Sequence, residues 1–256
     1  MIPKVRRWLE EQGFTLEMRT ASAFRAAGFE VRQSSHYIDP ESGKGREIDV
    51  VARDPDFIGV IDITFIVECK TTKKPWVFLC SPDTVAGYNR IFAYGVLSKK
   101  TIEAIDNRVS ELVNKLPWLK KDGLIGYGVR QALSDSDVAY AAGITVAKAC
   151  DSWVRRSDEQ YVPPYIAAFP IIVVDGSLLQ CSVCEDGSID ISEVDEGEWL
   201  FVARLPQYFG TCIRLVTLKR LTAFALEAKT AADQLRAELK TEEDRVVASW
   251  KPKRSK

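Results

Sequence analysis

The stretch REIDVVARDPDFIGVIDITFIVECKTT, residues 46–72, predicts the centre of the fold. It contains two runs rich in apolar and β-branched residues, 47–52 and 61–70, and such runs indicate strands. Aspartate, proline and glycine residues separate the runs, which favours a turn. We therefore expect two neighbouring strands that pair as a hairpin across 53–60.

Ionisable side chains lie inside both runs, and burying such groups costs free energy unless something pairs with them. Side chains in a strand alternate between its faces, so Ile48 and Val50 should point away from the face of Asp49. In the second strand, Glu68 should point to one side and Cys69 to the other. When the strands pair, Asp49 can meet Glu68. Two close carboxylates repel unless one takes a proton or a cation bridges them, and Mg²⁺ is the natural bridge because it prefers carboxylate oxygens and water.

This set of residues suits phosphodiester hydrolysis. A metal held by Asp49 and Glu68 would polarise a phosphoryl oxygen and lower the pKa of a bound water. Lys70 shares the face of Glu68 and could orient that water or stabilise charge on phosphorus. A second ion would lie roughly 3.5–4 Å away and assist the leaving oxygen. Glu17, in the first turn of an upstream helix, could hold it directly or through water.

The order of a helix with a glutamate, a strand with an aspartate and a strand with Glu-x-Lys resembles the restriction-endonuclease-like superfamily, also called PD-(D/E)XK nucleases. Three segments are similar in sequence to bacterial members with an Arg-Glu-Ile-Asp strand and a Glu-Cys-Lys strand. They are GFTLEMRTASAFRAAGFEV, YIDPESGKGREIDVVA and FIVECKTTKKPWVF. The resemblance spans about residues 13–80. It extends through FPIIVVDG, residues 169–176, which looks like a further core strand of such proteins.

The resemblance implies a role for each residue of the set. Asp49 and Glu68 would be metal ligands, together with the backbone carbonyl of Cys69. Lys70 would be the catalytic lysine, and Glu17 the auxiliary acid on the helix. The proline of the superfamily's name is absent before the aspartate, a variation that removes no ligand.

The same residues admit a structural interpretation. A Glu–Lys pair at a strand end and a turn aspartate occur by chance in many chains. Glu17 alone could be an acid that the helix dipole favours in a first turn. Near-zero net charge and a long carboxy-terminal helix also fit a non-cleaving protein of the same fold that binds nucleic acid or a partner. Cleavage of RNA is a further alternative.

Polar residues after the Glu-x-Lys strand are candidates for nucleic-acid binding. Thr72, Lys73 and Lys74 could hold phosphates through hydroxyl and ammonium groups. Arg130 precedes an expected helix and could line the same cleft, with a solvated loop as the equal alternative. Trp76 could stack on a base or sugar, or lie buried.

Three other motifs carry no functional assignment. His36 is the only histidine, and a lone loop histidine is usually solvated. Cys181 and Cys184 have no second pair of ligands, so we do not expect a structural zinc, which needs four. Gly126-x-Gly128 lacks the lysine and serine of a phosphate loop and is expected to be a turn.

Apolar periodicity predicts the other elements. Helices are expected over 3–12, 16–27, 98–116, 135–153 and 219–248, and strands over 29–34, 169–174, 178–183, 189–191, 200–205 and 211–218. Thr15 and Ser134 are the expected N-caps of the second and fourth helices. The carboxy-terminal helix has an apolar stripe that could pack on its own domain or form a homodimer or partner surface.

The expected fold is α/β. A restriction-endonuclease-like core of a mixed central sheet flanked by helices would occupy 1–176. A carboxy-terminal β/α extension, consisting of a β-hairpin and a long helix packed on the core, would occupy 177–250. Residues 251–256 would form a basic tail.

The composition constrains partners and location. The 256 residues are 46% hydrophobic and 28% charged with a net charge of −1, so a local patch must hold any anionic substrate. No signal peptide or membrane span is visible, and the six scattered cysteines suit a reducing cytosol. The expected protein is therefore a cytoplasmic, Mg²⁺-dependent deoxyribonuclease with DNA as its partner, in which Mn²⁺ substitutes for Mg²⁺. Repair, recombination or defence would be compatible settings.

Overall fold

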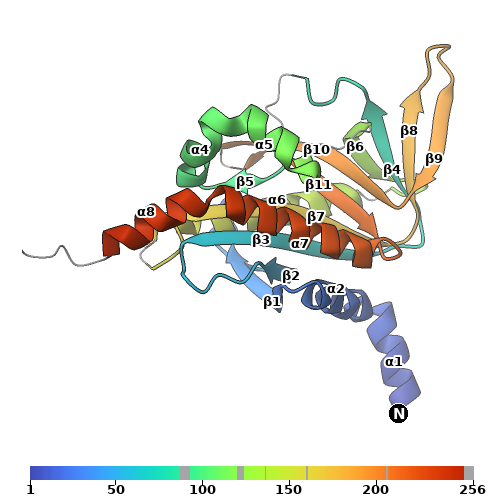
Figure 1. Cartoon of the computed structure of the whole chain (residues 1–256). Coiled ribbons are helices and arrows are strands. Elements are labelled where there is room, and N and C mark those ends of the chain that lie inside the picture. Colours follow the sequence, from blue (N-terminus) through green and yellow to red (C-terminus); the bar gives the residue numbers. More distant parts are fainter. Residues whose placement is uncertain (87–92, 120–123, 136, 160, 206, 251–256) are drawn as a thin grey trace, which may run out of the picture.

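The computed structural model describes residues 1–86, 93–119, 124–135, 137–159, 161–205 and 207–250. Within them, an eleven-stranded mixed sheet is covered by helices on both faces (Figure 1). The α/β class and the mixed sheet flanked by helices are thus confirmed. The expected tail, 251–256, lies outside the described residues.

Helices and strands alternate irregularly along the chain (Figure 1). The helices are α1 (Ile2–Glu11), α2 (Phe14–Ala26), α4 (Lys99–Ile105), α5 (Val109–Lys115), α6 (Val138–Arg155), α7 (Leu221–Glu238) and α8 (Lys240–Trp250), with short 3-10 turns η1 (Asp106–Arg108), η2 (Pro117–Leu119) and η3 (Arg156–Asp158). The strands are β1 (Glu30–Ile38), β2 (Gly45–Arg53), β3 (Ile61–Thr71), β4 (Trp76–Ser81), β5 (Val96–Leu97), β6 (Ile125–Gln131), β7 (Tyr165–Asp175), β8 (Leu178–Val183), β9 (Ile189–Val194), β10 (Glu196–Leu205) and β11 (Gln207–Thr217).

The sheet has the order β1-β2-β3-β7-β11-β10-β6-β4-β8-β9, and β5 pairs with β7. β1, β2 and β3 form an antiparallel meander, which confirms the predicted β2–β3 hairpin. β3 then runs parallel to β7 along its whole length, from the Ile61–Tyr165 pair to the Thr71–Asp175 pair. β10 and β11 lie between β7 and β6, so strands from before and after residue 176 form one continuous sheet.

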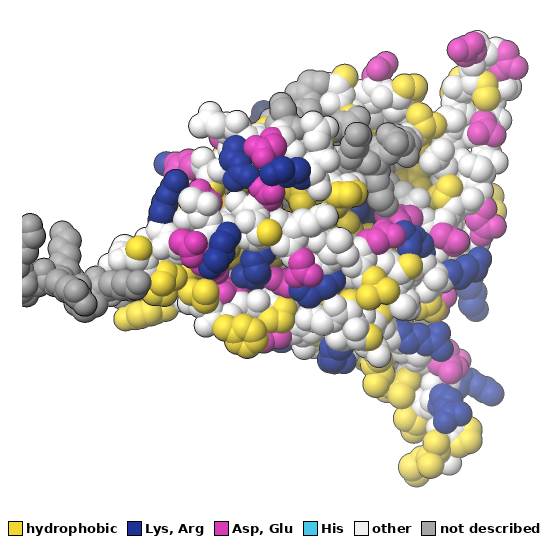
Figure 2. Space-filling view, in the orientation of Figure 1, with side chains coloured by type: hydrophobic (Ala, Val, Ile, Leu, Met, Phe, Trp, Pro, Cys, Tyr) yellow, Lys and Arg dark blue, Asp and Glu magenta, His cyan; other side chains and the backbone are white. Residues whose placement is uncertain are grey.

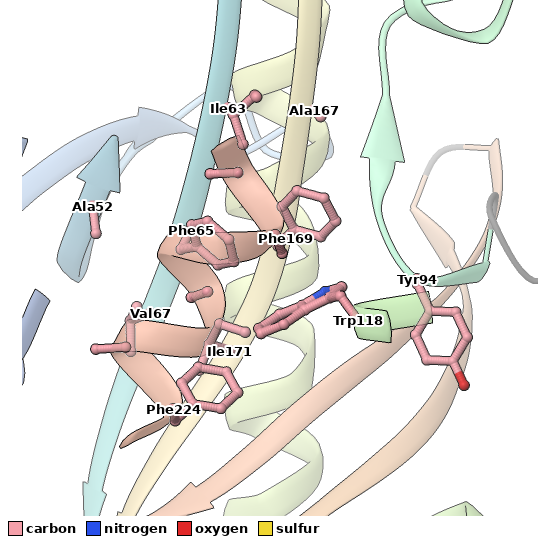
Figure 3. Packing of buried hydrophobic residues seen from close by; sticks show 14 of the residues in the cluster. Ala52, Ile63, Phe65, Val67, Tyr94, Trp118, Ala167, Phe169, Ile171 and Phe224 are labelled. Carbon is pink, nitrogen blue, oxygen red and sulfur yellow. The ribbon is translucent and has the colours of Figure 1, made fainter. Parts of the chain in front are cut away.

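Two apolar clusters hold the layers together, one on each face of the sheet. On the face covered by α2 and α7, Phe65 and Phe169 stack at 5.0 Å between ring centroids, and Trp118 lies 5.3 Å from Phe224 (Figure 3). On the other face, α6 packs against the alternate residues of the same strands, such as Ile66. β3 is buried on both faces because helices cover both, which explains its nearly continuous apolar sequence.

Several helix boundaries differ from the expectation. α2 begins at Phe14 after Gly13, which adopts a left-handed φ of 84°, so Thr15 is not the N-cap. α6 begins at Val138, and its N-cap is Asp137 rather than Ser134. The Asp137 carboxylate accepts a hydrogen bond from the backbone N–H of Tyr140, which satisfies one free donor of the first turn.

Two expected helices are interrupted. The 98–116 segment forms α4 and α5 with η1 between them, and the 219–248 segment forms α7 and α8 with a break at Leu239. The apolar stripe of α7 is buried against its own chain, including Leu221, Phe224 and Leu235.

The expected turn at Gly126-x-Gly128 is wrong, because both glycines lie within β6. A Cβ atom on Gly126 would lie 3.2 Å from the ring of Phe78 on β4 and 3.4 Å from the backbone oxygen of Glu198 on β10. Gly126 therefore permits close packing inside the sheet.

Candidate functional site

The middle of β2, the end of β3 and the first turn of α2 bring together the predicted acidic residues and lysine. Glu68 and Lys70 point to the same side of β3, and Lys70 Nζ lies 2.5 Å from Glu68 Oε1. Asp49 Oδ2 accepts a hydrogen bond of 2.7 Å from the backbone N–H of Cys69. Glu17, in the first turn of α2, lies close enough for the charges of Asp49 and Lys70 to affect its pKa.

β2 turns about its axis at Asp49. Ile48 packs in the cluster on the α6 face, whereas Val50 packs in the cluster on the α2 face, so the expectation that both share one face is wrong. The residue opposite Asp49 on β1 is Ser34, whose φ is 49°. The backbone register between β2 and β3 ends with the pair Val50–Val67. The Asp49 carboxylate accepts the next hydrogen bond in place of a backbone carbonyl.

Cys69 lies on the opposite face of β3 from Glu68 and Lys70 and packs in the core. Its side chain is buried in the α2-face core, and its sulfur lies 3.5 Å from the hydroxyl of Thr20 on α2. Burial raises the pKa of the thiol far above its ordinary value, which leaves it protonated and chemically inert. The alternation of side chains along β3 thus separates Cys69 from Glu68 and Lys70, as the sequence predicts.

The carboxylates have too little positive charge around them. Glu68 is only 6% exposed, and burial, followed by the charge of Asp49, raises its pKa to about 7. Burial and then Asp49 raise the pKa of Glu17 to about 6. Burial also raises the pKa of Asp49. Although burial favours a neutral amine, the Glu68 and Asp49 carboxylates raise the pKa of Lys70, which keeps it charged.

The donor chemistry of this set matches a hard divalent cation, because buried carboxylates with raised pKa values gain most from added positive charge. In the described part of the chain, however, no three His, Cys, Asp or Glu side chains are arranged closely enough to hold a metal ion. One oxygen of Asp49 is taken by the Cys69 N–H, and one oxygen of Glu68 is taken by Lys70. Asp49 Oδ1 and Glu68 Oε2 are the oxygens that these two hydrogen bonds leave for a cation.

The turn that follows β3 carries two exposed lysines, and a hydroxyl holds it in place. The Thr72 hydroxyl accepts hydrogen bonds from Gln131 Nε2 at 2.6 Å and Lys74 N at 3.1 Å, and it donates to Lys74 O at 2.8 Å. These three contacts occupy the hydroxyl, so Thr72 acts in the turn rather than as a free phosphate donor. Lys73 and Lys74 are exposed.

The other predicted nucleic-acid contacts differ in their surroundings. Arg130 is exposed on β6 and forms a 3.6 Å ion pair with Asp137. It precedes Gln131, whose bond to Thr72 joins β6 to the turn. Trp76 is fully buried in the core and cannot stack on a base.

Tyr37 is a neighbour of the site that the sequence did not reveal. It lies on β1, only 8% exposed. Burial raises its pKa to about 12, and the charges of Asp39 and Glu68 contribute to the shift. Tyr37 also borders a hollow of about 360 Å³ that is lined by His36, Trp153 and Arg156. The alternating pattern of β1 is the only sequence signal that could have indicated it.

The junction between α1 and α2 also lies near the end of β3. Gly13, which joins α1 to α2, lies so near the end of β3 that its Cβ position would be 3.9 Å from the Thr71 hydroxyl. α1 has no buried residue and exposes Lys4, Arg6 and Arg7. It extends away from the body of the molecule (Figure 1).

No family model, curated protein or solved structure matches the chain. None of the helices in the described residues combines the length and apolar character needed to cross a bilayer. The functional assignment therefore depends on the chemistry of the chain's own residues.

Proposed function

We propose that this protein is a metal-dependent nuclease that hydrolyses phosphodiester bonds in DNA, with a restriction-endonuclease-like core. The proposal is carried by one observation, the convergence of Asp49 in β2, Glu68 and Lys70 at the end of β3, and Glu17 in the first turn of α2. The pairing of β7 with β3 adds support, because the sequence resemblance includes a core strand at 169–176.

In this mechanism, Asp49 and Glu68 would hold Mg²⁺, together with the backbone carbonyl of Cys69. The ion, when bound, would supply polarisation of a phosphoryl oxygen and a lower pKa for a bound water. The ammonium group of Lys70, which lies beside Glu68, would orient that water or stabilise the charge that develops on phosphorus, which lowers the barrier electrostatically. Glu17 would support the leaving-group side directly or through water.

The substrate is held by local cations because the net charge of the chain is only −1. Lys73 and Lys74 follow the catalytic strand directly, and the turn fixed by Thr72 limits their positions. The exposed Lys4, Arg6 and Arg7 of α1 would add further phosphate contacts. Such phosphate contacts orient nucleic acid without reading its sequence.

A plasmid-nicking assay with purified protein and Mg²⁺ or Mn²⁺ tests the proposal. We expect nicking that chelation abolishes and that Glu68→Gln and Lys70→Ala remove. Glu185→Gln and Lys100→Ala, which change exposed residues distant from β3 in the sequence, serve as matched controls and should keep full activity. Full activity of both site variants would disprove the assignment.

A non-cleaving binding protein of the same fold is the second candidate. The observation that favours it is the absence, in the described residues, of three side chains arranged for a metal. Calorimetry separates the two candidates, because a non-cleaving protein would bind nucleic acid or a partner without binding Mg²⁺ or Mn²⁺. Matched DNA and RNA substrates in the cleavage assay would distinguish a deoxyribonuclease from a ribonuclease.

A further inference from the structure

The β8–β9 hairpin forms one end of the sheet. Within the described residues, β9 pairs with β8 alone, so its outer edge has no neighbouring strand. The hairpin projects from the body of the molecule (Figure 1). An edge of this kind presents backbone N–H and C=O groups that can accept another strand.

One face of the hairpin is apolar and exposed. The cross-strand pairs Val183–Ile189 and Cys181–Ile191 place four side chains on the same face. Val183, Ile189 and Ile191 are 70%, 68% and 59% exposed. On the opposite face, polar residues pair across the strands, as in Ser182–Asp190. The hairpin thus has one apolar face that no other element of the described chain covers.

All charged side chains of the hairpin itself are acidic. The chain contains no lysine or arginine between Arg156 and Arg204. The hairpin and the residue after it carry five carboxylates in this interval, namely Glu185, Asp186, Asp190, Glu193 and Asp195. Figure 2 shows acidic side chains gathered along the hairpin and at its tip.

The negative charge and the open strand edge limit which kinds of molecule can bind to the hairpin. Nucleic acid and anionic lipid are repelled by the carboxylates. A second copy paired edge to edge would bring the acidic residues of two β9 strands together, and like charges across strands are destabilising. A basic extended segment avoids both problems.

We propose that the edge of β9 and the adjoining apolar face bind a basic, extended segment of a partner protein, which adds a strand to the sheet. Backbone hydrogen bonds to β9 would provide affinity. Apolar side chains at alternate positions would cover Val183, Ile189 and Ile191, while lysine or arginine at the positions between them would face Asp190 on the opposite face. This proposal does not depend on nuclease activity.

The test uses the full chain and three fluorescein-labelled peptides. The probe is an acetylated Lys-Val-Lys-Val-Lys-Val-Lys peptide. The controls are Glu-Val-Glu-Val-Glu-Val-Glu, which reverses the charge, and Lys-Pro-Lys-Pro-Lys-Pro-Lys, which keeps the charge but lacks the N–H groups of alternate residues. Fluorescence anisotropy should show at least about tenfold tighter binding of the probe than of either control.

Variants of the hairpin then locate the binding. Asp190→Asn with Glu193→Gln, and separately Ile189→Ser with Ile191→Ser, should each weaken probe binding about tenfold. Glu30→Gln on β1, the strand at the other end of the sheet, is the control and should not. Circular dichroism verifies folding, and these exposed substitutions should leave it unchanged.

Three results would overturn the proposal. The first is equal binding of the three peptides, which would mean that the carboxylates only protect the edge from aggregation. The second is unchanged probe binding by both hairpin variants. The third is a dimer in light scattering that Ile189→Ser with Ile191→Ser converts to monomer, because a second copy would then be the occupant.

Discussion

The β2–β3 site and the β8–β9 hairpin both gather carboxylates, but they place them in opposite surroundings. Glu68 is buried, close to Asp49, and shares one lysine with it. Asp190 and Glu193 are exposed, and water can solvate them. Acidic residues therefore have different consequences in the two regions. We therefore propose a cation site for the buried group and a partner-binding surface for the exposed one.

The largest expected effect is on catalysis at the buried site. Asp49→Asn and Lys70→Ala should each reduce the rate of DNA cleavage by about 10²–10⁴-fold, the range typical for removing such groups. Glu17→Gln should reduce it by only about tenfold, because Glu17 assists without holding the main ion. Single-turnover cleavage measures all three. A loss with Glu17→Gln that equals the loss with Asp49→Asn would contradict this ranking.

The second effect concerns stability, and it should be large at the buried site and small at the exposed hairpin. The pKa of Glu68 rises from 4.5 to about 7 on folding. When the pKa of a carboxyl group is higher in the folded state, the folded protein becomes less stable as the pH rises through the interval between the two pKa values. At pH 8, ionised Glu68 therefore destabilises the metal-free protein. Glu68→Gln should therefore raise the free energy of unfolding by on the order of 1–3 kcal/mol.

The matched variant for this stability effect is Asp190→Asn on the hairpin. Because Asp190 is exposed, its change should be less than about 0.5 kcal/mol. Urea unfolding at pH 8 without divalent metal measures both variants. A decrease in stability for Glu68→Gln would mean that its ionised pair with Lys70 is net stabilising.

A smaller effect is expected for nucleic-acid affinity. Lys73→Ala with Lys74→Ala should weaken binding to DNA of any sequence and reduce the slope of log affinity against log salt by about one to two. Lys99→Ala with Lys100→Ala, on α4, is the matched control. An unchanged salt slope for the first pair would place the DNA elsewhere.

The smallest effect tests the turn that orients these lysines. Thr72→Val removes a hydroxyl with three hydrogen bonds, and Gln131 Nε2 then loses its partner. We expect a loss of about 1–2 kcal/mol in unfolding free energy with a modest loss of DNA affinity. Thr72→Ser, which keeps the hydroxyl, should restore both. Wild-type stability and DNA affinity in Thr72→Val would contradict the prediction, because valine keeps the methyl group and removes only the hydroxyl.

The sequence predicted the β2–β3 hairpin because its two strands and turn are local. The position of Asp49 was predictable only in part, since the turn of β2 at this residue accompanies the positive φ of Ser34, which no periodicity reveals. Tyr37 was missed because residues 37–45 are rich in turn residues, whereas β1 continues to Ile38. β6 was missed because Gly126 suggests a turn, and only the approach of Phe78 from another strand explains a glycine there.

Calorimetric titration of Mn²⁺ into the metal-free protein compares the two acidic regions in one experiment. Wild-type protein and the hairpin variant Asp190→Asn with Glu193→Gln should bind Mn²⁺ equally. Asp49→Asn with Glu68→Gln should bind none. Absence of binding by the wild type, or equal binding by all three proteins, would contradict the assignment of a cation site to β2 and β3.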